Sequence, residues 1–160
     1  MWTQMDSPVG QLRIVEQAGS ITAIEFEPFR PSSVGRPLGA RQDGHPVLTG
    51  AVAQLQAYFA RDLKEFDLPL APQGSAFQQQ VWQALRTVGY GETASYGEIA
   101  HRIGKTNAAS RAVGLANGQN PIPIVIPCHR IIGADGSLTG YAGGLERKRT
   151  LLDLEQDALF

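Results

Sequence analysis

The proline-rich stretch at residues 69–74 is the feature that most constrains how this chain of 160 residues can fold. Its two prolines fix the backbone and lack amide donors, so neither a helix nor a central strand continues through it. The hydrophobic pattern also changes there, from partly strand-like before it to mainly helical after it. We therefore predict two domains, residues 1–72 and 73–160. The chain is long enough to bury a real hydrophobic core.

The segment before this stretch has the pattern of a small antiparallel sheet and one helix. Residues 11–15 follow a Pro-Val-Gly turn signal, and residues 22–26 alternate after a Gly-Ser pair, which together predict a hairpin or meander. Residues 29–45 are rich in proline, glycine, serine and arginine, which predicts a loose surface connection. Apolar residues then recur at helical spacing over 47–59, which predicts an amphipathic helix.

The segment after the stretch is mainly helical in its pattern. Ser75 and Ser95 are each followed three residues later by glutamine or glutamate, the capping box that satisfies free amides at a helix start. They predict one helix over 77–85 and a shorter one through Ile99 and Ile103.

A third helix is expected over 108–116, with Asn107 as its N-cap. Together with the preceding helix it fits a helix-turn-helix and an ordinary pair of packed helices equally well. We expect Arg111 to be the only long side chain on a face of unusually small ones, which are Ala108, Ala109, Ala112, Gly114 and Ala116. Small side chains let a helix backbone come close either to another helix or to a nucleic-acid groove.

A glycine-rich loop over 133–144 and a terminal helix over 145–154 complete the chain. A loop of this length inside a compact domain is more often a pocket wall or lid than filler. Leu151 and Leu152 are expected to face inward. Glu155 is at helical spacing from both, so its carboxylate is expected to share their apolar face and to need a buried partner. The predicted fold class is α+β.

The chain has one cysteine, Cys128, within the sequence Ile-Pro-Cys-His-Arg-Ile-Ile. A single cysteine forms no intramolecular disulfide and no thiolate-rich metal cage, which leaves an inert buried thiol, a redox sensor or a nucleophile. Pro127 makes the backbone rigid, and the cationic neighbour Arg130 favours the thiolate. We therefore predict a nucleophile with a lowered pKa.

His129 is the candidate base for this thiol. Adjacent side chains on an extended chain point to opposite sides, so a bridging water or a local bend is needed to join His129 to Cys128. Glu155 is the candidate acid that orients the imidazole, and we expect the thiol pKa to depend on both residues. The three histidines, His45, His101 and His129, have no metal-ligand spacing, so no catalytic metal is expected. A thiol that itself accepts the transferred group is consumed in the reaction and needs no cofactor.

Composition sets the broad class. A net charge of −1 and a pI near 6.3 give no global attraction to nucleic acid, although a local basic footprint is still compatible with them. The start of the chain lacks the features of a signal peptide, and no apolar stretch is long enough to cross a bilayer. We expect a cytoplasmic protein with no membrane partner.

These motifs resemble the O6-alkylguanine-DNA alkyltransferase family, single-use repair proteins that move an alkyl group from damaged guanine to their own cysteine. The resemblance covers residues 77–155, with weaker support before them. It is carried, in order and spacing, by Arg-Ala-Val-Gly from Arg111, Asn120-Pro121, Pro-Cys-His-Arg around Cys128, Gly140-Tyr141 and Glu155. It implies a ribonuclease H-like N-terminal domain that only supports the fold. It also implies a C-terminal domain with a helix-turn-helix and an active-site loop.

The resemblance also implies a role for each matching residue. Cys128 is the alkyl acceptor, His129 the water-assisted base, Glu155 its orienting acid and Asn120 the brace of the turn before the active-site strand. Tyr96 lies beside the lesion base and supplies a proton to the departing guanine. The expected substrate-pocket residues are Pro123, Ile131, Tyr141 and Ala142, and Ala142 stands where some relatives carry serine. The expected DNA-binding residues are Tyr96, Ala109, Arg111, Ala112 and Gly114.

The implied partner is double-stranded DNA containing O6-alkylguanine, bound by a monomer, with cooperative binding left open. Minor activity on O4-alkylthymine is also left open. Two alternatives use the same residues. A lesion sensor on this fold binds without transfer, but such proteins replace the cysteine. A cysteine hydrolase shares the Cys-His-acid set, but the adjacent Cys-His order and the helix pair disfavour it.

Overall fold

In a computed structural model, residues 1–29 and 38–157 are described. Part of the surface connection expected over 29–45, namely residues 30–37, lies outside them. The chain divides into two compact units, Met1–Pro72 and Gln73–Phe160. Among the described residues, no helix combines the length and hydrophobicity needed to cross a membrane.

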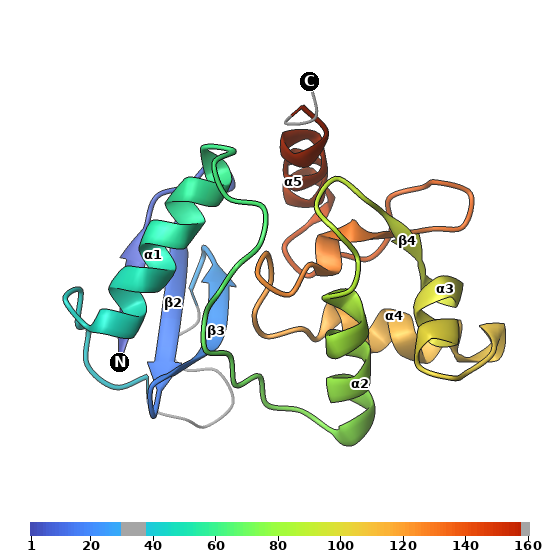
Figure 1. Ribbon diagram of the computed structural model, residues 1–160, viewed down its shortest axis with the longest axis horizontal. Helices are drawn as coiled ribbons and strands as arrows, with labels where there is room; N and C mark the ends of the chain where they lie inside the picture. Colours follow the sequence, from blue (N-terminus) through green and yellow to red (C-terminus); the bar gives the residue numbers. More distant parts are fainter. Residues whose placement is uncertain (30–37, 158–160) are drawn as a thin grey trace. The chain divides into compact units, whose positions relative to one another are not determined.

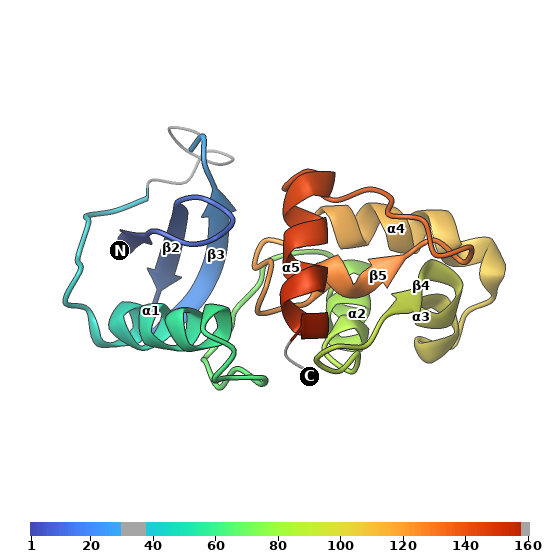
Figure 2. The ribbon, with the colours of Figure 1, turned by 90° about the horizontal axis from the view of Figure 1, so that it is seen from above.

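The first unit is a three-stranded antiparallel sheet with one helix across a face (Figures 1 and 2). Its elements are β1 (Trp2–Met5), β2 (Leu12–Gln17), β3 (Ser20–Phe26) and α1 (Pro46–Phe59). Apolar side chains from sheet and helix form the core, and fully buried members are Leu12, Ile14, Ile21, Leu48, Leu55 and Tyr58. The sequence analysis missed β1, a short edge strand.

The alternation expected over residues 22–26 holds only in part. The pairing of β2 with β3 shifts between Val15 and Glu16, so that Val15 faces Ala23 while Glu16 faces Ile21. This irregularity leaves Thr22 outside the ladder and gives the strand two buried residues, Ile21 and Ile24, three positions apart. A bulge of this kind breaks the period of two on which the expectation depended.

The second unit is mainly helical. Its elements are α2 (Ala76–Leu85), β4 (Ala94–Ser95), α3 (Tyr96–Arg102), η1 (Asn107–Ala109), α4 (Ser110–Gly118), η2 (Cys128–Arg130), β5 (Ile131–Ile132) and α5 (Leu145–Asp157). Both expected capping boxes are present, on Ser75 with Gln78 and on Ser95 with Glu98. Together the two units confirm the α+β class.

The expected N-cap of the third helix is wrong. Asn107 begins a 3-10 turn instead, and α4 starts only at Ser110, with no side-chain cap at either start. A Cβ on Gly97 would lie 2.8 Å from Asn107 Oδ1, so the Asn107 carboxamide is packed against α3. Tertiary packing has therefore overridden the local capping signal.

Two short strands that the sequence did not reveal bring distant parts of this unit together. β4 and β5 pair in parallel, with Ala94 opposite Ile131 and Ser95 opposite Ile132. Tyr96 follows directly after β4, and the Cys128 turn directly precedes β5. The pairing thus places the start of α3 close to the cysteine.

Candidate active site

Cys128 lies on a 3-10 turn and not on the extended strand that the sequence predicts. Its amide donates to Ile126 O at 2.8 Å, and the residue is only 4% exposed. A 3-10 turn projects adjacent side chains at about 120° rather than to opposite sides. The chain therefore bends here, as one of the two possibilities in the sequence analysis required, but among the described residues no hydrogen bond joins the thiol to His129.

The turn before the cysteine is held by Asn120. Its Nδ2 donates to Ile126 O at 2.8 Å, and its Oδ1 accepts from Ile122 N at 3.0 Å. Between these contacts Ile124 has φ +74°, a left-handed conformation that is rare for a β-branched residue and typically costs about 1–3 kcal/mol. The Asn120 brace therefore holds a strained backbone in place immediately before the cysteine.

His129 and Glu155 form the buried pair that the sequence predicts. His129 Nε2 lies 2.7 Å from Glu155 Oε2, and the side chains are 0% and 1% exposed. Burial lowers the pKa of His129, so the imidazole is neutral at pH 7. Because the ionised carboxylate accepts, Nε2 carries the ring proton and Nδ1 is left as an acceptor.

Arg130 has a different role from the one predicted. Its guanidinium forms a bidentate pair with Glu155, in which Nε donates to Oε1 at 2.9 Å and Nη2 donates to Oε2 at 3.0 Å. Its Nη1 donates to Val88 O at 2.7 Å. Burial alone would raise the pKa of Glu155, but His129 and Arg130 outweigh it and lower that pKa to about 2. Arg130 is thus committed to the acid and not to the thiol.

The expected low pKa of Cys128 is wrong. Burial raises the thiol pKa to about 11, although hydrogen bonds from Asn120 and Tyr141 and the charge of Lys148 act in the opposite direction. Desolvation penalises the thiolate more than these groups stabilise it. The resting cysteine is a protonated thiol, so a proton acceptor is needed when it reacts.

The four expected substrate-pocket residues are not equally placed. Tyr141 is 9% exposed and its hydroxyl interacts with the sulfur, so it lies at the reacting atom. Pro123 and Ile131 are buried next to Asn120 and the cysteine turn respectively, whereas Ala142 is exposed. Of the two loop residues, Tyr141 thus faces the thiol, whereas Ala142 is open to solvent.

Tyr96 begins α3 and is tied to the glycine-rich loop. Its hydroxyl lies 2.9 Å from Thr139 Oγ1 and 3.3 Å from Thr139 O. Gly114 of α4 faces the Tyr96 ring, because a Cβ there would lie 3.6 Å from it. Gly114, expected at the DNA, is half-buried, and its small size allows α3 and α4 to approach closely at Tyr96.

Lys148 is a site residue that the sequence analysis missed. It is 0% exposed, and its Nζ donates to Ile131 O and, at 2.7 Å, to Thr139 O. Burial lowers its pKa to about 8. The available signal was the helical spacing of 148, 151 and 155, which places Lys148 on the same buried stripe as Glu155. Leu154, and not Leu152 as expected, is the second buried leucine of α5.

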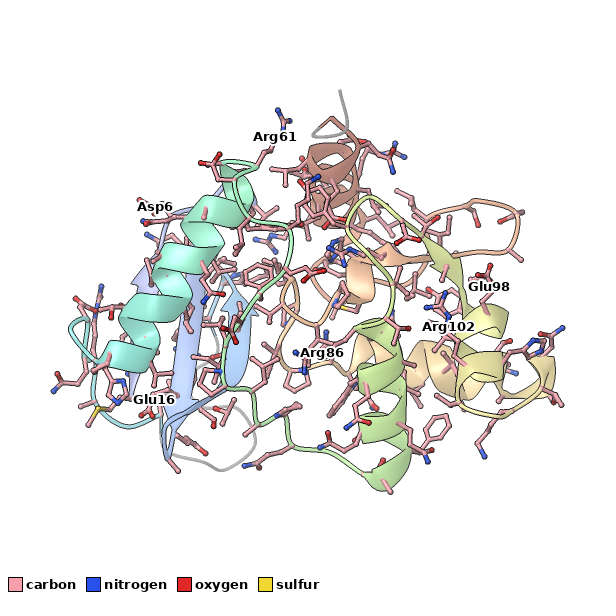
Figure 3. The ribbon with its side chains drawn as sticks, viewed as in Figure 1. Asp6, Glu16, Arg61, Arg86, Glu98 and Arg102 are labelled. Atoms are coloured by element: carbon pink, nitrogen blue, oxygen red, sulfur yellow. The ribbon has the colours of Figure 1, made fainter. Side chains whose placement is uncertain are left out.

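The outer face of α4 carries Arg111. Exposed with it are Ala112 and, in the preceding η1, Ala108, whereas Ala109 is half-buried. The opposite face of α4 is buried through Val113, Ala116 and Asn117. Arg111 is not the only long side chain on the outer face, because Leu115, one turn further along, is 65% exposed. Arg102 projects from α3 and donates to Thr87 Oγ1 at 2.7 Å (Figure 3).

Comparison with known proteins assigns both units to one family. Residues 76–157 match the family described as 6-O-methylguanine DNA methyltransferase, DNA binding domain, and residues 1–72 match its ribonuclease-like domain. A methylated-DNA--protein-cysteine methyltransferase of Mycolicibacterium paratuberculosis is 53% identical over 154 residues, which are 95% of this chain and 90% of that protein. The chain belongs to the 6-O-methylguanine DNA methyltransferase family.

Further relatives agree with this membership. The methylated-DNA--protein-cysteine methyltransferase of Haemophilus influenzae is 48% identical over 156 residues, 97% of this chain and 86% of that one. The crystal structure of Mycobacterium tuberculosis OGT in complex with DNA superposes with a TM-score of 0.89 at 49% identity. It covers 98% of this chain and 93% of that one.

The ribonuclease-like unit of this family member carries a polar cavity that the sequence analysis did not foresee. The cavity has a volume of about 350 Å³. Asp43 Oδ1 accepts there from Thr3 Oγ1 at 2.7 Å and from Arg41 Nε at 2.9 Å. Among residues 1–29 and 38–157, no group of three or more His, Cys, Asp or Glu side chains is arranged to hold a metal ion.

Proposed function

We propose that this protein repairs DNA by transferring the alkyl group of O6-alkylguanine to Cys128. The observation that carries the proposal is a buried thiol next to a neutral imidazole, which is itself held by an ionised carboxylate. Membership of a family whose relatives are named methylated-DNA--protein-cysteine methyltransferases supports the substrate. The proposed compartment is the cytoplasm.

The reaction begins from the protonated thiol. As the lesion enters, the Cys128 proton passes to His129 Nδ1, and the imidazolium formed is stabilised by Glu155. The sulfur lone pair forms a bond to the alkyl carbon while the bond from that carbon to O6 breaks. The electron pair stays on the guanine, which takes up one proton to restore the normal base. Burial of the thiol thus limits unwanted alkylation, because the thiolate forms only when His129 accepts its proton.

Tyr96 is the proposed source of the proton that the guanine takes up. Its hydroxyl contacts Thr139 of the glycine-rich loop. Tyr96 also follows β4, which pairs with the strand directly after the cysteine turn. Tyr141 is the proposed pocket residue at the sulfur, where its hydroxyl stabilises the developing thiolate. The product is a thioether with no good leaving group, so each molecule acts once and no cofactor is required.

The proposed partner is double-stranded DNA. The sulfur is buried within the protein, so the base must leave the stack for its O6 substituent to reach it. The exposed surface of η1 and α4 is the proposed contact, because Ala108 of η1 and Ala112 of α4 allow close approach and Arg111 extends from α4. Arg111 is proposed to occupy the space that the base vacates.

Intact-protein mass spectrometry after exposure to an oligonucleotide containing O6-methylguanine tests this function. We expect one stable methyl adduct per molecule on Cys128, with restored guanine in the DNA and no adduct on Cys128→Ala. DNA binding without an adduct would indicate a lesion sensor. Repeated product formation without an adduct would indicate a hydrolase, and either result would refute the proposal.

A further inference from the structure

Two buried acceptor atoms next to the cysteine have no hydrogen-bond partner among the described residues. They are His129 Nδ1 and Asn117 Oδ1, on side chains whose residues are 0% and 1% exposed. Leaving a buried polar atom without a partner costs free energy, so such atoms in folded proteins call for an explanation. The sequence analysis assigned no role to Asn117.

The orientation of the Asn117 carboxamide is fixed by its contact. Its Nδ2 lies 3.3 Å from Cys128 O, which only accepts, so the amino group must point there and Oδ1 must point away. That contact anchors the carboxamide on the carbonyl of the peptide bond that joins Cys128 to His129. His129 Nδ1 therefore belongs to a residue of this peptide bond, and Asn117 Oδ1 belongs to a side chain that is hydrogen-bonded to it.

The thiol also lacks a direct route to the base. No hydrogen bond joins Cys128 Sγ to His129 in residues 1–29 and 38–157, and the interactions of the thiol are with Asn120 and Tyr141. The proposed function requires the thiol proton to reach Nδ1. A single water within reach of the sulfur and of both acceptors meets this requirement, since buried water typically makes about three hydrogen bonds.

We propose that Asn117 is a positioning residue for the alkyl transfer, whose Oδ1 and His129 Nδ1 together orient one buried water against the Cys128 thiol. A water molecule has two hydrogens to donate, and these two acceptors use both of them. Its remaining lone pairs can then only accept, so the water receives the thiol proton as it passes one of its own to Nδ1. Asn117 thereby fixes the direction of proton transfer.

This inference rests on the proposed function, so its test starts from wild-type protein that forms the methyl adduct. Asn117→Leu keeps the approximate side-chain size and removes Oδ1 together with the Nδ2 donor to Cys128 O, whereas Asn117→Asp keeps an acceptor oxygen and should retain more of the rate. We expect the maximal single-turnover rate of Asn117→Leu with free O6-benzylguanine to fall on the order of 10- to 100-fold. This loss is smaller than the roughly 10²- to 10⁴-fold loss of an entire base. The substrate concentration at half-maximal rate should be unchanged.

A double-mutant cycle separates this role from a structural one. If Asn117 acts only through the water bound to His129, then Asn117→Leu should cause little further loss of rate in the His129→Ala background. Val113→Ala, on the buried face of the same helix, is the matched control for destabilised packing and should keep the wild-type rate once folded. Additive losses, or an equal loss in the control, would overturn the proposal.

A high-resolution crystal structure of the wild-type protein tests the water without any variant. Density for a water within hydrogen-bond distance of Asn117 Oδ1, His129 Nδ1 and Cys128 Sγ is the expected result. Oδ1 bonded elsewhere, or a thiol bonded directly to Nδ1, would overturn the proposal. Absence of an adduct in wild-type protein would instead refute the proposed function.

Discussion

The two units bury polar side chains in different ways. In the first unit Glu16, which Figure 3 labels, is 5% exposed and accepts from Gly19 N at 2.9 Å. The Met1 ammonium group lies 3.5 Å from Glu16 Oε1, and His45 Nε2 lies 3.6 Å from Oε2. In the second unit Glu155 is 1% exposed and is held by His129 and Arg130.

The difference lies in what the partners leave free. The partners of Glu16 are the Met1 ammonium group, the Gly19 amide in a turn and His45, the N-cap of α1. Its contacts therefore hold backbone segments of the first unit together. One partner of Glu155 is the His129 imidazole, whose other nitrogen has no hydrogen-bond partner among the described residues and belongs to the residue next to the thiol. Of these two buried carboxylates, the one at the reactive site is therefore the one whose imidazole partner keeps an unused acceptor near a nucleophile.

The largest expected effect is that of Cys128→Ala. The variant should form no alkyl adduct, because the acceptor atom is gone. It should keep its affinity for DNA containing O6-methylguanine, because phosphate and pocket contacts are retained. Mass spectrometry and a binding titration check the two parts. A methylated form of the variant would place the acceptor elsewhere in the molecule.

His129→Ala should slow transfer by roughly 10²- to 10⁴-fold, the usual contribution of a positioned base. The reason is that the thiol, whose pKa is about 11, then has no buried acceptor for its proton. Single-turnover rates with O6-methylguanine DNA provide the measurement, and His45→Ala in the first unit is the control. A similar loss of transfer rate in His45→Ala would show that the effect of His129 is not specific to the candidate active site.

Arg111→Ala should slow repair of duplex DNA by about 10-fold or more and leave the reaction with free O6-benzylguanine nearly unchanged. Extruding a base costs a few kcal/mol, which an inserted side chain partly offsets, and the free base needs no extrusion. The ratio of the two rates is the quantity to compare. Equal slowing of both reactions would mean that Arg111 supports the pocket or the fold.

The smallest effect concerns the pH dependence of the thiol. Because the folded pKa of Cys128 is raised to about 11, its alkylation by iodoacetamide should keep rising with pH up to about 11 and show no plateau near pH 7. An unfolded thiol ionises near pH 9, so this burial also lowers stability as pH rises from about 9 to 11. A reactivity plateau at neutral pH would contradict the buried protonated thiol.

Much of this arrangement could be predicted from the sequence because it depends on local chemistry. The two capping boxes, the helix over 47–59 and the inward position of Glu155 are set by residues close together in the chain. The thiol pKa could not be predicted, because it depends on how deeply packing buries the sulfur. The pairing of Arg130 with Glu155 could not be predicted either, because Glu155 lies 25 residues further along the chain, on α5.

A comparison of Glu16 with Glu155 tests whether alkyl transfer depends on the buried carboxylate that holds His129 and not on burial of a carboxylate in general. Each carboxylate is replaced by glutamine, and single-turnover rates on O6-methylguanine DNA are taken where circular dichroism shows both variants folded. Glu155→Gln should lose roughly 10²-fold in rate and, by leaving Arg130 unpaired, about 3–5 kcal/mol of stability. Glu16→Gln should lose stability alone and keep its rate within about twofold. Equal loss of rate in the two variants would contradict the account.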